Sequence, residues 1–150
     1  MAITERHIFG WARELALQAA IQVSLGEAVR KTPERYATFD WNSDHYNVEL
    51  KSRPDGASKD WSTWLVPVDK TIGRDGRKPV LFYYWHKDKT LWRCFPDDWN
   101  KDDWMKHVPH WKESQEHYWI PKECFTQIPL RMVEEDEGKI EGAASPATAE

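Results

Sequence analysis

Two carboxylates and a lysine fall on one face of a hairpin that alternating residue types predict. Side chains of a strand point to opposite faces with a period of two, so Glu49 and Lys51 share a face. If Asn42 pairs with Asn47, Asp40 lies directly opposite Glu49, with the two Cβ atoms about 5 Å apart. Two carboxylates at that distance repel each other unless a positive charge lies between them. The pattern therefore predicts a site for a divalent cation, with a lysine close by.

The hairpin that must position these side chains covers residues 36–53. Its first strand alternates Phe39 and Trp41 with polar residues, and its second strand does the same with Val48. A polar turn at residues 43–45 joins the two strands. One face of the hairpin can therefore enter a core while the other carries the charged groups.

Hydrophobic periodicity predicts the elements around the hairpin. Residues 3–31 predict an amphipathic helix that ends before Pro33, and residues 57–79 predict a short helix followed by a strand. The remaining elements are strands at 80–86 and 90–95, a helix at 97–108, a strand at 118–120 and a helical turn or loop at 121–128. This order predicts an α+β or α/β-like fold with a central mixed sheet.

The composition predicts a single domain over residues 1–133 and a tail over residues 134–150. The net charge is -4, and the six acids and one base of the tail leave the body at +1, so bulk charge neither favours nor excludes DNA. We expect the acidic tail to be disordered. The sequence shows neither an apolar run of about 20 residues nor a secretory signal, which predicts no membrane span. Because Cys94 and Cys124 are too few for a disulfide framework, we expect a cytoplasmic location.

Ten tryptophans in 150 residues are the oddity of the composition. Most are expected in the core or at its edges because the indole buries a large area, but an exposed subset would stack on nucleobases or sugars. An alternative prediction is therefore a non-catalytic, tryptophan-rich module that binds nucleic acid, glycan or protein. A zinc site is disfavoured, because Pro109 interrupts the helix that would align its first two histidines. Its candidate ligands are His107, His110, His117 and Cys124.

An acid on one strand, followed by Glu49-Leu50-Lys51 on the next, resembles the signature of the PD-(D/E)xK nuclease superfamily. The run ELKSR at 49–53 is similar to several members, resolvase-like ones included, and the element order is similar over roughly residues 3–130. The resemblance implies a restriction-endonuclease-like core, in which an N-terminal helix precedes a central mixed sheet flanked by helices. The chain departs from the family pattern where Phe39 replaces the usual proline.

The resemblance also implies an activity, namely Mg²⁺- or Mn²⁺-dependent hydrolysis of DNA by an endonuclease or resolvase-like enzyme that would be able to form a homodimer. Asp40, Glu49 and the main-chain carbonyl of Leu50 would be the metal ligands, since hard oxygen atoms suit Mg²⁺. Lys51 would orient the attacking water or offset charge on the phosphate. The candidate substrate-binding residues are Arg53, Lys87 and Lys89.

Members of the superfamily often carry a further glutamate on the preceding helix, for which Glu27 and Glu14 are the candidates. The two are 13 positions apart, which places them about 220° apart on a helix, so they cannot both face the sheet edge. Glu27 is preferred as the fourth catalytic residue, because it is nearer the hairpin and follows Gly26. Asp44 ranks below Asp40 as the first acid, since it falls in the turn. The competing interpretation of the charged face is a solvated hairpin with a cross-strand ion pair.

Overall fold

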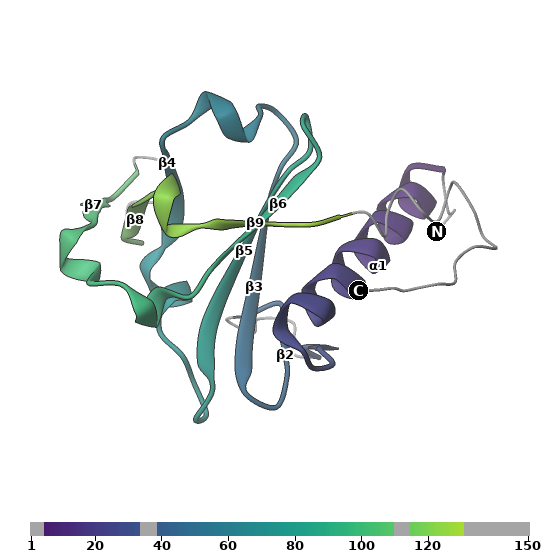
Figure 1. Ribbon diagram of the computed structural model, residues 1–150, viewed down its shortest axis with the longest axis horizontal. Coiled ribbons are helices and arrows are strands. Elements are labelled where there is room, and N and C mark those ends of the chain that lie inside the picture. The colour runs from purple at the N-terminus through teal and green to yellow at the C-terminus, as the bar shows by residue number, and fades with distance from the viewer. Residues whose placement is uncertain (1–4, 34–38, 110–114, 131–150) are drawn as a thin grey trace. The chain divides into compact units, whose positions relative to one another are not determined.

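The computed structural model describes residues 5–33, 39–109 and 115–130, and the predicted tail at 134–150 lies outside them (Figure 1). The chain forms two compact units, one of residues 1–26 and 129–150 and the other Glu27–Ile128. The first unit contains helix α1 (Glu5–Leu25), and the second contains every strand of the described residues. The second unit also holds the described part of the predicted hairpin, residues 39–53, so it positions the candidate site.

Helix α1 is shorter at its C-terminus than the predicted helix, which was wrong beyond Leu25. Gly26 has a φ of 75°, a left-handed conformation that favours glycine, and its amide donates to the carbonyl of Gln22 over 2.8 Å. This geometry ends the helix, so Glu27 lies in the connection and not on the helix. No helix in the described residues combines the length and the apolar character needed to cross a bilayer.

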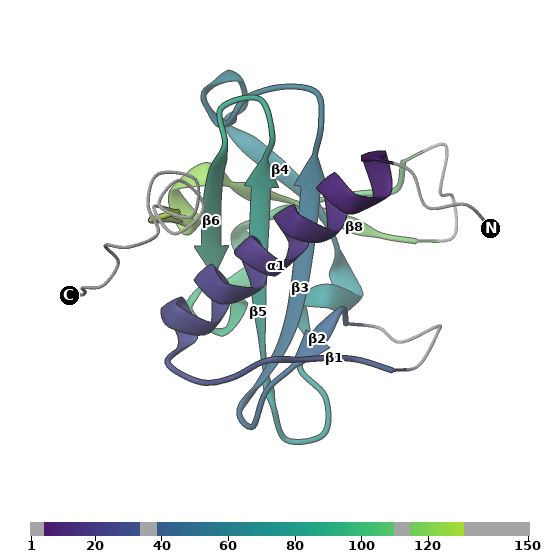
Figure 2. The same ribbon diagram turned by 90° about the vertical axis from the view of Figure 1, so that its right-hand side faces the viewer.

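A six-stranded mixed sheet forms the centre of the second unit. Its strand order is β1-β2-β3-β5-β6-β9, and β3 pairs with β5 in parallel while the other neighbours are antiparallel. Figure 2 shows β3, β5 and β6 side by side. The strands are β1 (Arg30–Lys31), β2 (Trp41–Asn42), β3 (Tyr46–Arg53), β5 (Lys78–Trp85), β6 (Thr90–Cys94) and β9 (Thr126–Ile128). The predicted central mixed sheet is confirmed.

A second, antiparallel sheet of three strands covers one face of the large sheet. Its order is β4-β8-β7, with bounds β4 (Thr63–Pro67), β8 (His117–Pro121) and β7 (Met105–His107). Short 3-10 turns flank β4 at Ser58–Asp60 (η1) and Val68–Thr71 (η2). A parallel pair of strands needs a crossover connection, which is usually helical. Here β4 and its two turns make the β3–β5 crossover.

The helix predicted over residues 97–108 is wrong. The segment forms 3-10 turns at Pro96–Asp98 (η3) and Lys101–Asp103 (η4), followed by strand β7. The Asn100 side chain accepts from the amide of Asp102, and such local bonds from Asn and Asp compete with helix. The helical spacing also misleads, because Trp104 is buried whereas Trp99, Met105 and Val108 are exposed.

The α+β class is therefore confirmed, with mostly sheet and α1 as the α-helix of the described residues. The flanking helices expected on both sides of the sheet are not seen in that part of the chain. The restriction-endonuclease-like core stays a prediction.

Aromatic side chains fill the space between the two sheets. Trp64 of β4 is 1% exposed, and its ring lies 4.9 Å from that of Tyr83, 5.3 Å from Trp85 and 4.7 Å from Phe125. Because every second residue of β5 points to this face, Tyr83 and Trp85 both reach Trp64. Of the eight tryptophans whose burial is described, Trp41, Trp64, Trp85 and Trp104 are buried and Trp92 and Trp119 lie at the edge of the core, while Trp61 remains 52% exposed. The core fixes the position of β4 across the face that carries Glu49.

Candidate metal-binding and catalytic site

The hairpin register places the two acids as the sequence predicts. Asn42 pairs with Asn47 and Trp41 with Val48, so the residue that precedes β2, Asp40, lies opposite Glu49. The turn between β2 and β3 is tight, since the amide of Ser43 donates to the carbonyl of Tyr46 over 2.9 Å. The predicted register of the hairpin is confirmed.

A main-chain hydrogen bond holds the Asp40 carboxylate against β3. Its Oδ2 atom accepts from the amide of Leu50 over 2.9 Å. Within a strand, the N–H and C=O of one residue point to the same side, so the Leu50 carbonyl is directed to the edge where Asp40 lies. The three oxygen groups expected to bind a metal therefore belong to one short stretch of the hairpin.

The Glu49 carboxyl is buried, with 14% of its side chain exposed. Burial and, to a lesser degree, the nearby Asp40 carboxylate raise its pKa to about 7, against the opposite effect of Lys70 and Lys51. Its Oε1 atom is buried and makes no hydrogen bond of good geometry with the described residues. A buried carboxylate oxygen needs a positively charged partner, and the Lys70 ammonium 3.4 Å away supplies part of that charge.

Lys70 of η2 is a member of the site that the sequence did not predict. Its Nζ atom lies 3.4 Å from Glu49 Oε1 and 5.8 Å from the centre of the Phe39 ring, and only 17% of its side chain is exposed. The ammonium group therefore offsets part of the repulsion between the two carboxylates. Nothing local in the sequence marks this lysine, because its position depends on β4 crossing the sheet.

Lys51 lies on the same face of β3 as Glu49 and is half-buried. It pairs with Tyr83 of β5, and its charge acts to lower the pKa of Glu49. Arg53 follows on that face, where its Nε atom donates to the Tyr83 hydroxyl over 2.9 Å. The structure thus brings Lys51 and Arg53 onto the strand face that carries Glu49.

Lys87 and Lys89 are not brought to the carboxylates. They belong to the turn between β5 and β6, where the amide of His86 donates to the Arg53 carbonyl. Four strand positions separate the level of Tyr83, next to Lys51, from Lys87, a span of roughly 13 Å. These two lysines would contact only a more distant part of a substrate.

Glu27 is not brought to the carboxylates either. Its Oε2 atom accepts from the His45 amide over 3.0 Å, and its Oε1 atom accepts from His45 Nδ1 over 2.9 Å. Hydrogen bonds from Ser43 and His45 lower the pKa of Glu27 to about 2. The turn that holds Glu27 is four strand residues from Glu49, or roughly 13 Å. Glu27 therefore stabilises the hairpin turn.

The other two acidic candidates do not join the site. Asp44 lies in the turn with its side chain 76% exposed and 3.5 Å from Arg30. The side chain of Glu14 lies outside the described part of the molecule. Of the acids weighed, the described residues bring only Asp40 and Glu49 together.

The Glu27→Gln variant is expected to lose about 1–2 kcal/mol of unfolding free energy, because charged hydrogen bonds to the turn become neutral ones. The DNA cleavage that the superfamily resemblance implies should stay within about twofold of the wild type. Urea unfolding and initial cleavage rates measure the two effects. Asp44→Asn, on the same turn but exposed, should change stability by less than about 0.5 kcal/mol. A tenfold or larger loss of cleavage in folded Glu27→Gln would return Glu27 to the catalytic site.

The donor set fits a hard divalent cation. No group of three or more His, Cys, Asp or Glu side chains that could hold a metal occurs among the described residues. Mg²⁺, however, keeps several waters and is usually bound through one or two carboxylates plus substrate phosphates. Asp40, Glu49 and the Leu50 carbonyl meet that requirement. Two of the candidate zinc ligands, His107 and His117, lie opposite each other on β7 and β8. The Nδ1 atom of His117 lies 3.1 Å from the Gln115 carbonyl. A third candidate, His110, lies outside the described residues.

Comparison with known proteins identifies no relative of this chain. No protein-family model, curated protein or solved structure matches the chain. The superfamily resemblance therefore stays a prediction that rests on the hairpin residues.

The raised pKa of Glu49 predicts how stability depends on pH. The group binds its proton more tightly in the folded chain, so the unfolding free energy should fall as pH rises from about 4.5 to about 7. The total fall is about 3 kcal/mol. Glu49→Gln should abolish this fall in the unfolding free energy. Lys70→Gln should extend the fall to higher pH, because Lys70 lowers the pKa of Glu49. Millimolar Mg²⁺ should restore stability at pH 8 but not at pH 5.

Thermal unfolding between pH 5 and 8, in buffers of constant ionic strength, measures this effect. Parallel stability profiles for the wild type and Glu49→Gln would contradict a titrating, buried Glu49.

Proposed function

We propose that this protein is a Mg²⁺-dependent phosphodiesterase that hydrolyses DNA, as an endonuclease or resolvase-like enzyme. The observation that carries the proposal is Asp40, which is held by the Leu50 amide opposite a buried Glu49 carboxyl. Lys51 follows Glu49 on the same strand face. An acid opposite an E-x-K strand is the arrangement that the resemblance to PD-(D/E)xK nucleases requires.

Each residue has a separate task in this proposal. Asp40, Glu49 and the Leu50 carbonyl would hold the cation, which when bound lowers the pKa of a coordinated water and polarises the scissile phosphate. Lys51 would offset the negative charge that develops on the phosphate in the transition state. Lys70 keeps Glu49 more readily ionised, since its charge lowers the pKa of that carboxyl. Ionised Glu49 is the form that binds a metal.

The proposal is tested by incubating the protein with supercoiled plasmid, branched DNA and single-stranded DNA at pH 8. We expect cleavage in Mg²⁺ or Mn²⁺ and none in EDTA. Because burial raises the pKa of metal-free Glu49 to about 7 and the proton competes with the metal, the rate at limiting Mg²⁺ should rise as pH increases through about 7. Cleavage that persists in EDTA, or no cleavage of any of the three substrates, would contradict the proposed activity.

A second candidate function is a non-catalytic binding module on the same frame. Lys70 favours it, because an ammonium group 3.4 Å from Glu49 already supplies positive charge at the carboxylates. Titration with Mn²⁺ distinguishes the two functions. One bound ion per chain that is lost in Glu49→Gln supports the enzyme, whereas no bound ion in the wild type supports the binding module.

A further inference from the structure

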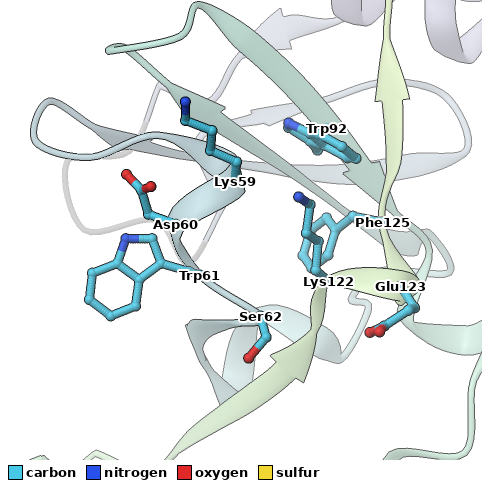
Figure 3. Close-up of a pocket in the computed structure, with 8 residues that line it drawn as sticks. All are labelled: Lys59, Asp60, Trp61, Ser62, Trp92, Lys122, Glu123 and Phe125. Carbon is cyan, nitrogen blue, oxygen red and sulfur yellow. The ribbon is translucent and has the colours of Figure 1, made fainter.

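A shallow pocket of about 600 Å³ opens on the second unit, away from the carboxylates (Figure 3). Its walls come from η1 and the start of β4 on one side and from β6 and the segment after β8 on the other. Aromatic and basic side chains dominate the lining, namely Lys59, Trp61, Trp92, Lys122 and Phe125. None of these residues has a task in the proposed hydrolysis.

Trp61 presents a flat aromatic surface to solvent. The residue is 52% exposed, whereas Trp41, Trp64, Trp85 and Trp104 are buried. One edge of the indole lies close to the backbone at Gly56, where an added Cβ atom would be 3.3 Å from its Nε1 atom. An exposed indole is suited to stack on a planar ligand.

Two lysines supply positive charge at one end of the pocket, whose lining has no net formal charge because Asp60 and Glu123 also belong to it. Lys122 Nζ lies 5.1 Å from the centre of the Trp92 ring, and Lys59 extends toward the same end of the pocket (Figure 3). Of the two acids in the lining, Asp60 projects to the same side as the Trp61 ring (Figure 3). The Asp60 carboxylate accepts from the Ala57 amide, and the Glu123 side chain points away from Lys122 (Figure 3). The ligand should therefore combine a planar ring with a negative charge.

We infer that this pocket binds an unpaired nucleotide of single-stranded DNA, with its base stacked on Trp61 and its phosphate near Lys59 and Lys122. Aromatic rings with neighbouring basic groups are the usual means of binding single strands without sequence preference. The choice of DNA as the nucleic acid rests on the proposed function. The pocket then defines the substrate class as DNA with a single-stranded or branched segment.

The pocket and the carboxylates lie at opposite ends of β4. Trp61 precedes that strand and Lys70 follows it, so its five residues separate the two regions by roughly 16 Å. Both regions use the same face of the large sheet, because Lys51, Tyr83 and Trp92 are aligned across β3, β5 and β6. The small sheet covers that face between the two regions, where Trp64 and Tyr83 are buried, so the pocket is a binding site separate from the carboxylates.

Binding of a fluorescein-labelled 12-mer of thymidylate in EDTA, followed by anisotropy, tests the inference without cleavage. Trp61→Ala should weaken binding about tenfold, and Trp61→Phe should retain most of the affinity. Lys122→Gln should reduce the slope of log K against log salt by about 0.7, the contribution of one phosphate contact. The controls are Trp99→Ala and Lys106→Gln, which alter an exposed tryptophan and an exposed lysine outside the pocket.

Unchanged affinity in Trp61→Ala, or an equal loss in Trp99→Ala, would overturn the inference. Displacement of the oligonucleotide by a neutral oligosaccharide would also overturn it, in favour of a glycan site. Since EDTA removes the metal, a protein that binds the oligonucleotide through Trp61 but never cleaves DNA contradicts the proposed hydrolysis and leaves the pocket assignment standing.

Discussion

Glu49→Gln is expected to lower Mg²⁺-dependent DNA cleavage by about a hundredfold or more at pH 8. The amide keeps the size of the side chain but removes the negative charge that would hold the metal. Mutation of a residue that only orients a metal ligand typically lowers metal affinity or activity by about 10- to 100-fold. Loss of a direct ligand should lower the cleavage rate by at least as much. The initial rate of plasmid nicking measures the effect.

The same substitution should not destabilise the fold. Glu49 is buried with a raised pKa, so a neutral side chain removes an unfavourable buried charge, and the unfolding free energy at pH 8 should stay equal or increase. The matched control is Asp102→Asn, an exposed acid outside the site, which should nick DNA at the wild-type rate. A Glu49→Gln protein that nicks DNA within about twofold of the wild type would remove Glu49 from the site.

Trp64→Ala is expected to cost about 3–5 kcal/mol of unfolding free energy, a large share of the stability of a domain of this size. The indole is 1% exposed and contacts the rings of Tyr83, Trp85, Trp92 and Phe125. Its removal leaves a cavity between the two sheets and loosens β4. The turn η2, which places Lys70 next to Glu49, directly follows that strand. Urea unfolding followed by circular dichroism measures the loss.

Two further variants distinguish the loss of packing at Trp64 from the effect of removing any tryptophan. The buried Nε1 atom of Trp64 has no hydrogen-bond partner among the described residues, so Trp64→Phe removes an unsatisfied donor and should cost less than Trp64→Ala. Trp99→Ala, at a 44% exposed side chain, should change stability by less than about 0.5 kcal/mol. A loss below about 1 kcal/mol in Trp64→Ala would contradict the role of this ring in joining the sheets.

Local alternation was sufficient to predict the parts of the fold that carry the acids. The pairing of Asn42 with Asn47 follows from the need to bury Trp41 and Val48 on one face, since a slip of one residue would expose both. The strands predicted at 80–86 and 90–95 correspond to β5 and β6 for the same reason. Period-two patterns are read directly from sequence when one face is buried.

Contacts between segments that are distant in the chain could not be predicted from local alternation. Helix α1 ends at a single glycine, and that geometry moves Glu27 into a connection where it binds the turn at His45. Lys70 reaches Glu49 only because the β3–β5 crossover uses a strand in place of a helix. Neither arrangement leaves a periodic signal in the sequence.

The most direct test of the proposed site compares the wild type with the double variant carrying Asp40→Ala and Lys51→Ala. Supercoiled plasmid and branched DNA are incubated with each protein at pH 8 in Mg²⁺, with EDTA as the blank and circular dichroism as the check on folding. We predict cleavage by the wild type and none above the blank by the folded double variant. Cleavage by the double variant at a rate near that of the wild type would contradict the assignment of hydrolysis to Asp40, Glu49 and Lys51.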